Sequence, residues 1–343
     1  MMIGVSLYFQ DINLDYLSNV IDCGVTHVFT SLQVIEEEYG DVSQKIQTVL
    51  EFCKDKNIIL IPDIAPRTLE KLKIKNIEEI KELGLHAIRI DGGYGTVEEV
   101  KKLTNLFEVY LNASDVQPSF IKELNDAGCD MSKVSVMHNF YPRLYTGLEK
   151  EHLISINKEF KKNNVRVGAF VQGDVKLRGP VFEGLPTLES HRGVNPYVAC
   201  VELLDCYVDD VYIGDNEASV EAIQMMLDYQ KDNVLTLKAV LDKEYEDLYN
   251  KDIPIRRDIT EHIVRLSYGR GVYNDVLQRK TLKRCIGDIT IDNNLSGRYV
   301  GEINICKKNL NSDGKVNIVG HVYPELLSLL DMVKRDTIIR FVR

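Results

Sequence analysis

The sequence lacks the features of several common protein classes. No stretch approaches the roughly 20 apolar residues that a membrane-spanning helix needs. The opening "MMIGVSLYFQD" has neither the basic region nor the apolar core of a signal peptide. There is no block of basic residues, and 42 Lys and Arg against 52 Asp and Glu give a formal net charge of −10. We therefore expect a cytoplasmic protein whose main partner is neither nucleic acid nor a membrane, although a small anionic ligand needs only a local cluster of cations.

Cysteine usage argues against a disulfide framework. The chain has 7 cysteines, an odd number, and no CxxC pair. Reduced thiols are the simplest interpretation, and the spacing favours neither a metal site nor a nucleophilic cysteine. The 7 histidines are scattered, which gives little support to a metal hydrolase. We expect no metal and no cofactor.

The first two-thirds of the chain alternates apolar strand-like runs with helical patterns. Each run is nearly continuous in apolar residues, as expected for parallel strands covered by helices. The pattern predicts a (β/α)8 barrel over residues 1–232, with a doubly wound open sheet as the alternative. No GxGxxG follows the first run, which counts against a dinucleotide-binding sheet. The eight runs are residues 3–9, 27–32, 58–64, 87–93, 107–114, 133–140, 166–173 and 209–216.

The pattern changes after about residue 232. The segment "KDNVLTLKAVLDKEYEDLYN" looks like a connector, and shorter strand-like runs with turn signals follow it. "NSDG", at 311–314, predicts a hairpin between its flanking runs, and "YPELLSLLDMV" predicts one helix. We therefore expect a small, mainly β domain over residues 233–343.

Active sites of (β/α)8 barrels lie at the carboxyl ends of the strands, so polar residues near the ends of the runs are candidates. Each has a structural alternative. Asp91 precedes Gly92 and could form a turn, His138 could be a core histidine, and Asp215 could simply begin a helix. No run ends in a lysine, which argues against a Schiff-base enzyme. The candidates are Ser6, Tyr8, Asp63, Arg89, Asp91, Asn112, His138, Asn139, Tyr141, Gln172, Asp174, Asp210, Asp215 and Asn216.

The loop "LRGPVFEGLPTLESHRG", residues 177–193, carries mixed charge on a backbone broken by proline and glycine. It holds Arg178, Glu183, Glu189 and Arg192 directly after the seventh run. A solvated connector is one interpretation. The other is a substrate loop with acids for chemistry and guanidiniums for an anion, although Arg192 could instead pair with Glu189 three residues earlier.

Three segments, "MHNFYPRLYTGL" (137–148), "RGPVFEGLPTLESHR" (178–192) and "DDVYIGDNEAS" (209–219), together with "IGVSLYF", resemble the 6-phospho-N-acetylmuramidase family. The resemblance spans the chain and implies a (β/α)8 barrel followed by a cyclophilin-like β domain. It also implies hydrolysis of MurNAc-6-phosphate–GlcNAc in the cytoplasm, during recycling of peptidoglycan. The products are MurNAc-6-phosphate and GlcNAc.

Glycoside hydrolysis needs two carboxyl groups that flank the scissile bond. We hypothesise that Asp91 and Glu183 form the pair, with Asp210 as the alternative carboxylate. The substrate carries a phosphate and a lactyl carboxylate, so local guanidiniums are expected to bind it. The expected substrate-binding residues are Tyr8, His138, Asn139, Arg143, Gln172, Arg178, Glu189, Arg192 and Asp215.

The sequence also allows other interpretations of the function. A non-catalytic sugar-phosphate-binding or regulatory barrel is the main alternative, and a sugar-phosphate isomerase or aldolase is a third. In the second domain, Tyr268, Arg270 and Tyr273 form a turn that is either structural or in contact with substrate. The oligomeric state is open, a homo-oligomer included.

Overall fold

The computed structural model describes residues 2–31, 42–65, 76–91 and 95–343. Contacts within the chain divide it into two compact units, Met1–Gln224 and Met225–Arg343. Among the described residues, no helix is both long enough and apolar enough to cross a membrane.

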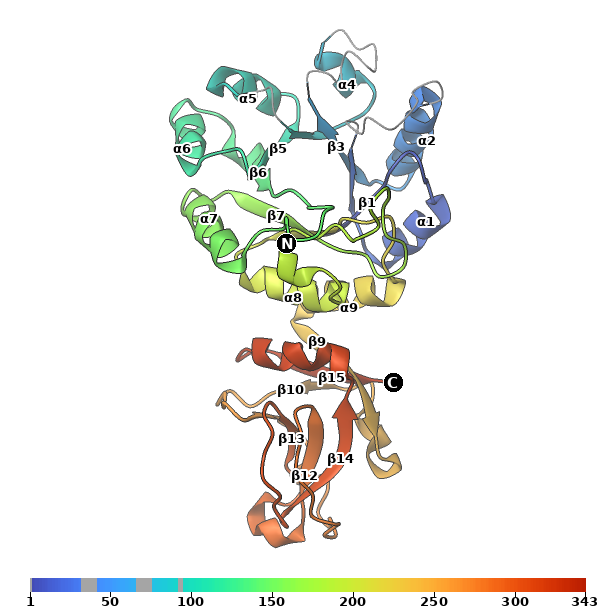
Figure 1. Ribbon diagram of the computed structural model, residues 1–343, viewed down its shortest axis with the longest axis vertical. Coiled ribbons are helices and arrows are strands. Elements are labelled where there is room, and N and C mark those ends of the chain that lie inside the picture. The colour runs from blue at the N-terminus through green and yellow to red at the C-terminus, as the bar shows by residue number, and fades with distance from the viewer. Residues whose placement is uncertain (1, 32–41, 66–75, 92–94) are drawn as a thin grey trace. The chain divides into compact units, whose positions relative to one another are not determined.

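The first unit is the predicted barrel. Eight parallel strands pair in chain order, and the last pairs with the first to close the sheet. Figure 1 shows these strands inside a ring of helices. The strands are β1 (Met2–Ser6), β2 (His27–Ser31), β3 (Ile59–Ile64), β4 (Ala87–Ile90), β5 (Glu108–Asn112), β6 (Val134–Met137), β7 (Arg166–Val171) and β8 (Asp210–Ile213).

The outer helices follow the apolar periodicity of the segments between the strands. Several begin at caps that the sequence supplies. The Asn13 side chain accepts from the Tyr16 amide at one helix start, and Thr96 forms a capping box with Glu99 at another. The helices are α1 (Leu14–Cys23), α2 (Val42–Asp55), α4 (Glu78–Glu82), α5 (Val97–Thr104), α6 (Pro118–Asp126), α7 (Lys150–Lys162), α8 (Pro196–Asp205) and α9 (Val220–Asp232).

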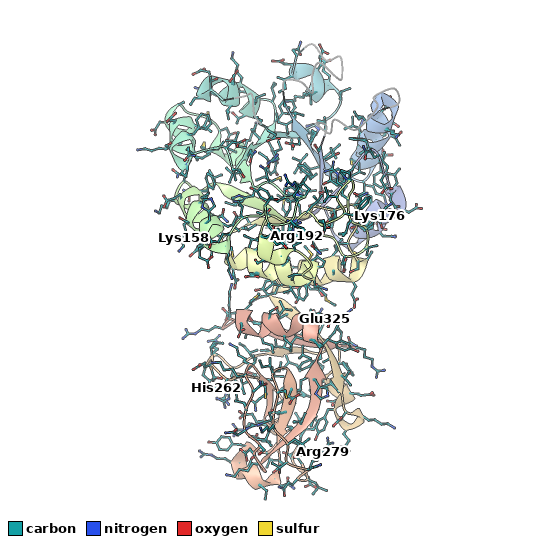
Figure 2. The ribbon with its side chains drawn as sticks, viewed as in Figure 1. Lys158, Lys176, Arg192, His262, Arg279 and Glu325 are labelled. Carbon is teal, nitrogen blue, oxygen red and sulfur yellow. The ribbon has the colours of Figure 1, made fainter. Side chains whose placement is uncertain are left out.

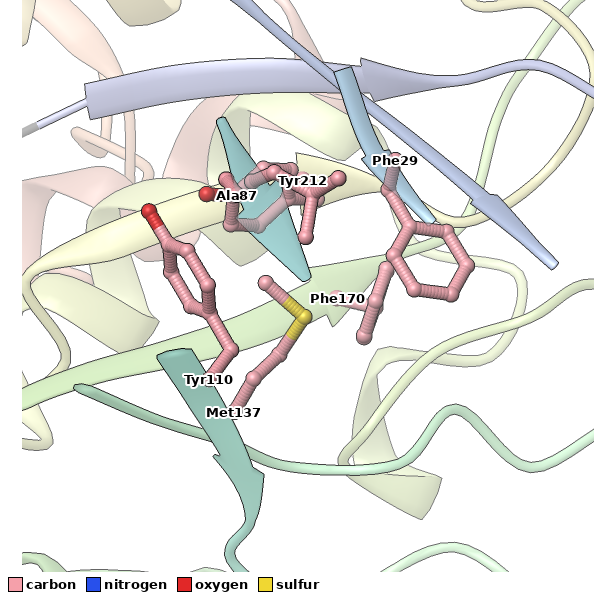
Figure 3. Packing of buried hydrophobic residues seen from close by; sticks show 7 residues of the cluster. Phe29, Ala87, Tyr110, Met137, Phe170 and Tyr212 are labelled. Atoms are coloured by element: carbon pink, nitrogen blue, oxygen red, sulfur yellow. The ribbon is translucent and has the colours of Figure 1, made fainter. Parts of the chain in front are cut away.

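The barrel interior is a packed layer of side chains (Figure 3). Seven strands contribute one buried residue each: Phe29, Ile61, Ala87, Tyr110, Met137, Phe170 and Tyr212. The remaining strand, β1, contributes Gly4, because a Cβ there would collide with the Tyr212 ring. Two small residues and six larger ones thus fill the barrel, and any ligand must lie above this layer.

The second unit is a curled, mixed seven-stranded sheet, as the prediction of a mainly β domain requires. Its spatial order is β10-β15-β9-β14-β12-β13-β11, and only the β15–β9 pair is parallel. A 3-10 helix, Pro324–Met332, occupies the predicted helical segment. The strands are β9 (Val234–Leu241), β10 (Asp252–Pro254), β11 (Ile263–Arg265), β12 (Asp288–Asp292), β13 (Ile303–Cys306), β14 (Val316–Val322) and β15 (Ile338–Val342).

Two predictions for this unit were wrong. The expected connector contains β9, a central strand that pairs with both β14 and β15. The "NSDG" segment does not close a hairpin, because β13 and β14 each pair with β12, which lies between them. Both errors have one cause: turn residues and apolar runs mark where strands begin and end, whereas the partner is set by segments far away in the chain.

Candidate active site

A cavity of about 580 Å³ opens at the carboxyl ends of the barrel strands. Its floor is apolar and includes Phe29, Phe140 and Phe170, whose rings pack edge to face with centroids 5.1 to 6.2 Å apart. Its polar side is formed by the ends of β2, β3 and β4, and the opposite wall by the loop after β7. An apolar floor with a few convergent polar groups is typical of a small-molecule site.

Arg89 organises the polar side of the cavity. Its side chain is buried, and its Nη1 donates to Asp63 Oδ1 at 2.8 Å. Its Nη2 donates to Asn139 Oδ1 at 2.5 Å and to the Met137 carbonyl at 3.3 Å. These contacts are possible because β3 and β4 pair with Asp63 opposite Arg89. The guanidinium therefore links the ends of three strands into one rigid wall.

Two carboxyl groups share this guanidinium. Asp63 is buried, whereas 36% of the Asp91 side chain is exposed, and Asp91 Oδ1 lies 4.0 Å from Arg89 Nη1. Asn112 Nδ2 donates to Asp91 Oδ1 at 2.9 Å and so fixes its orientation. Because both carboxyls contact one nitrogen, their nearest oxygens lie within about 7 Å, which is compatible with the separations found in glycosidases.

Burial separates the chemistry of these two acids. Desolvation is the main cause that raises the pKa of Asp63 to about 6; Arg89 opposes the rise and the Asp91 charge adds to it. The Asp63 carboxyl can therefore carry a proton near neutral pH. The more exposed Asp91 lies beside the Arg89 guanidinium. A proton donor beside a carboxylate is the arrangement that acid–base chemistry requires.

The loop after β7 is fastened by the buried carboxylate of Asp215, which follows β8. Asp215 accepts backbone N–H bonds from Gly173 and Arg178 at 2.9 Å and from Leu185 at 3.0 Å. Gly214 lies under this loop, and a Cβ there would collide with the Leu185 carbonyl. Asp215 thus orders the cavity wall from within the protein.

Arg192 fastens the other end of the same loop; Figure 2 labels it within the barrel unit. Its guanidinium donates to the carbonyls of Tyr141, Arg143, Glu183 and Gly184 and forms a two-pronged ion pair with Glu189. The hydrogen bonds from Arg192 are the largest cause that lowers the pKa of Glu189 to about 2. Both charged groups are occupied by the protein itself, so the ion-pair interpretation of these residues holds.

The remaining guanidiniums on the cavity are those of Arg178 and Arg143. The Arg178 guanidinium carbon lies 3.8 Å from the centroid of the Tyr8 ring and 5.9 Å from that of Phe140. Within the part of the chain that the structure describes, neither Arg178 nor Arg143 has a carboxylate within ion-pair distance. Cations that face a cavity without such a partner are suited to an anionic ligand.

Several expected site residues lie elsewhere. Asp210 begins β8 rather than ending it, and it pairs with Arg166 at the amino-terminal end of the barrel, away from the cavity. His138 is fully buried, and its Nε2 bonds to Asn157 of α7 behind the barrel wall. Placing Asp210 and His138 at the cavity was therefore wrong.

The structure also shows where three more of the expected site residues lie and what they contact. Gln172 is almost fully buried, and its Oε1 accepts from the Gly193 amide at 2.7 Å. Tyr8 donates to the Gly214 carbonyl at 2.5 Å and contributes its ring under Arg178. Glu183 is exposed on the loop and does not line the cavity, although its carbonyl accepts from Arg192.

The structure brings together Asp91, Asn139, Arg143 and Arg178 from the expected set. It adds Asp63 and Arg89, which stood among the polar strand ends but were not selected as site residues. Their signal was available in the sequence, because both lie near the ends of neighbouring apolar runs.

In the second unit, the hydroxyls of Tyr268 and Tyr273 both donate to Asp247, at 3.3 and 2.7 Å.

Within the described ranges, 2–31, 42–65, 76–91 and 95–343, no group of three or more His, Cys, Asp or Glu side chains is arranged to hold a metal ion.

Comparison with known proteins gives matches along nearly the whole chain. A family model described as 6-phospho-N-acetylmuramidase, N-terminal, matches residues 3–228, and its C-terminal counterpart matches residues 234–342. No curated protein matches the chain.

Two solved structures are similar over the full chain. One is a conserved Enterococcus faecalis protein of unknown function, with a TM-score of 0.86, 29% identity and coverage of 100% of this chain and 96% of the other. The second is an uncharacterized B. cereus protein, with a TM-score of 0.81, 29% identity and coverage of 100% and 99%.

Proposed function

The chain belongs to the 6-phospho-N-acetylmuramidase family, and we propose that it hydrolyses MurNAc-6-phosphate–GlcNAc to MurNAc-6-phosphate and GlcNAc. The observation that supports this most strongly is the cavity, which has two carboxyl groups on one side and, on its rim, two guanidiniums without a carboxylate partner among the described residues. The substrate matches both features, because it has a glycosidic bond to cleave and two anionic groups to bind. We place the reaction in the cytoplasm, as a step in peptidoglycan recycling.

Asp63 is the proposed general acid. Its pKa of about 6 lets it hold a proton close to neutral pH and transfer that proton to the leaving oxygen of GlcNAc. Oδ1 accepts from Arg89, so Oδ2 carries the proton in this account. Arg89 then stabilises the carboxylate that remains after the transfer.

Asp91 is the proposed second carboxylate. It serves as the base or nucleophile at the anomeric carbon, in an orientation set by Asn112. Asp63 therefore replaces Glu183 in the pair that the sequence suggested, because Asp63 lines the cavity and Glu183 does not.

The test uses the purified full chain with MurNAc-6-phosphate–GlcNAc and measures released GlcNAc by mass spectrometry. We expect Asp63→Asn and Asp91→Asn each to lower kcat by about 10²–10⁴-fold, the usual contribution of a positioned acid or base. Glu183→Gln is the matched control and should turn over close to wild type. Near-wild-type turnover by both aspartate variants would rule out this catalytic pair, and binding without hydrolysis by the wild type would favour a non-catalytic sugar-phosphate-binding protein.

A further inference from the structure

Among the described residues, three arginines line the cavity, and their surroundings differ. Arg89 is buried, and its guanidinium is already occupied by hydrogen bonds to Asp63 and Asn139. Arg143 is exposed on the loop after β6. Arg178 is partly buried on the loop after β7, and its guanidinium lies over the Tyr8 ring. Among the described residues that line the cavity, Arg178 is the one arginine that combines a guanidinium without a carboxylate partner with a held, partly buried position.

The position of Arg178 is fixed from two sides. Its backbone N–H donates to the Asp215 carboxylate at 2.9 Å, and its guanidinium stacks on Tyr8. The Tyr8 hydroxyl in turn donates to the carbonyl of Gly214, the residue before Asp215. One short segment after β8 therefore holds both the loop that carries Arg178 and the ring beneath it. An arginine held in this way loses less conformational entropy when it binds an anion.

The two halves of the cavity lie across the barrel from each other. Asp63 lies near the end of β3 and Asp91 directly follows β4, whereas Arg178 and its supports follow β7, β8 and β1. The loops after strands 7 and 8 are where (β/α)8 barrels often bind phosphate groups. In a hexopyranose 6-phosphate, C1 and C5 flank the ring oxygen, and the phosphate extends away from the ring on C6. A sugar with its anomeric carbon at the carboxyl pair therefore keeps its phosphate clear of the reacting bond, and Arg178 on the loop after β7 is a cation available to receive it.

We propose that Arg178 is the receptor of the substrate's 6-phosphate, and that Asp215 is a positioning residue that holds Arg178 in place for it. This assignment rests on the proposed function for its substrate. The more exposed Arg143 then binds the lactyl carboxylate, which carries a single charge. Tyr8 acts as the platform beneath the guanidinium and makes no bond to the phosphate in this assignment.

The experiment compares two substrates, MurNAc-6-phosphate–GlcNAc and its unphosphorylated form, with three variants. Arg178→Met keeps the apolar stem that packs on Tyr8 and removes the charge. We expect it to lower kcat/KM for the phosphorylated substrate by about 10–100-fold, the value of a charge-assisted hydrogen bond or two, and to leave the unphosphorylated substrate unchanged. Arg143→Met, the matched control, should lower kcat/KM for both substrates by the same factor.

Asp215→Asn tests the positioning role. It should raise KM for the phosphorylated substrate much more than KM for the unphosphorylated substrate, with little change in the ratio of the two kcat values. A merely structural defect would instead lower kcat for both substrates together. If this variant does not fold, the comparison of Arg178→Met with Arg143→Met decides the assignment alone. Equal losses on both substrates in Arg178→Met, or a phosphate-specific loss in Arg143→Met, would overturn it.

A binding measurement separates failure of this assignment from failure of the proposed function. Calorimetry with MurNAc-6-phosphate and with MurNAc requires no turnover. Wild type should bind the phosphorylated sugar more tightly, and Arg178→Met should remove that preference. Should the wild type cleave neither disaccharide, the hydrolase proposal fails, while this pair of ligands still tests the phosphate subsite. Equal binding of both sugars by the wild type would reject the subsite whatever the enzyme does.

Discussion

Raising the pH through 6 should reduce turnover if Asp63 is the general acid. Its pKa is raised to about 6, chiefly by burial, and only the protonated form can donate. The protonated fraction is then about one-tenth at pH 7 and about one-hundredth at pH 8, so kcat should fall roughly tenfold for each pH unit above 6. Released GlcNAc, measured at saturating substrate between pH 5 and pH 8.5, gives this profile.

Two controls make the profile specific to Asp63. A sugar phosphate has its own second pKa near 6, so the unphosphorylated disaccharide is assayed in parallel; its profile should show the same fall. Asp63→Asn should have a much lower kcat, and that kcat should not fall as the pH rises above 6. A kcat that is flat from pH 6 to 8.5 for both disaccharides would refute the assignment of Asp63 as the acid.

The remaining predictions concern the supports of the site and the barrel. Glu189→Gln should lower the Tm most above pH 4.5, and the gap to wild type should narrow as pH falls, because a pKa lowered to about 2 gives stability that is present above the ordinary value of 4.5 and is lost toward 2. Asp210→Asn removes one partner of the Arg166 ion pair and should cost about 1–2 kcal/mol in urea unfolding, with kcat unchanged; a loss of turnover with an intact fold would contradict its position away from the cavity. Gly4→Ala places a methyl group against Tyr212 and should cost about 1–3 kcal/mol of unfolding free energy, whereas an unchanged or raised Tm would show that the barrel interior has room to spare.

The sequence predicted the barrel well because its strands are buried on both faces and appear as continuous apolar runs. It predicted strand boundaries less well. Asp210 was counted among the residues near the carboxyl end of the eighth run, 209–216, although it is the second residue of that run and the first residue of β8. In the second unit, the apolar run of β9 was taken for a connector, because its partners, β14 and β15, lie about 80 residues or more further along the chain.

The site was predicted in part. Asp91, Asn139, Arg143 and Arg178 were selected as site residues, and all four line the cavity. The pairing of Asp63 with Arg89 could not be predicted, because it depends on the register of β3 against β4, which local patterns do not specify.

The directions in which side chains point just beyond the end of a strand could not be predicted either. His138 follows β6 and turns outward to bond Asn157 of α7. Residues that support the loop from within, such as Asp215, resemble substrate ligands in sequence because both roles use the same polar side chains.

The most direct test of the whole account is the incubation of the wild-type chain with MurNAc-6-phosphate–GlcNAc, followed by mass spectrometry of the products. We predict equimolar MurNAc-6-phosphate and GlcNAc, formed at a rate that Asp91→Asn lowers by about 10²-fold or more. Intact disaccharide after prolonged incubation, with the sugar phosphate bound to the protein, would contradict it.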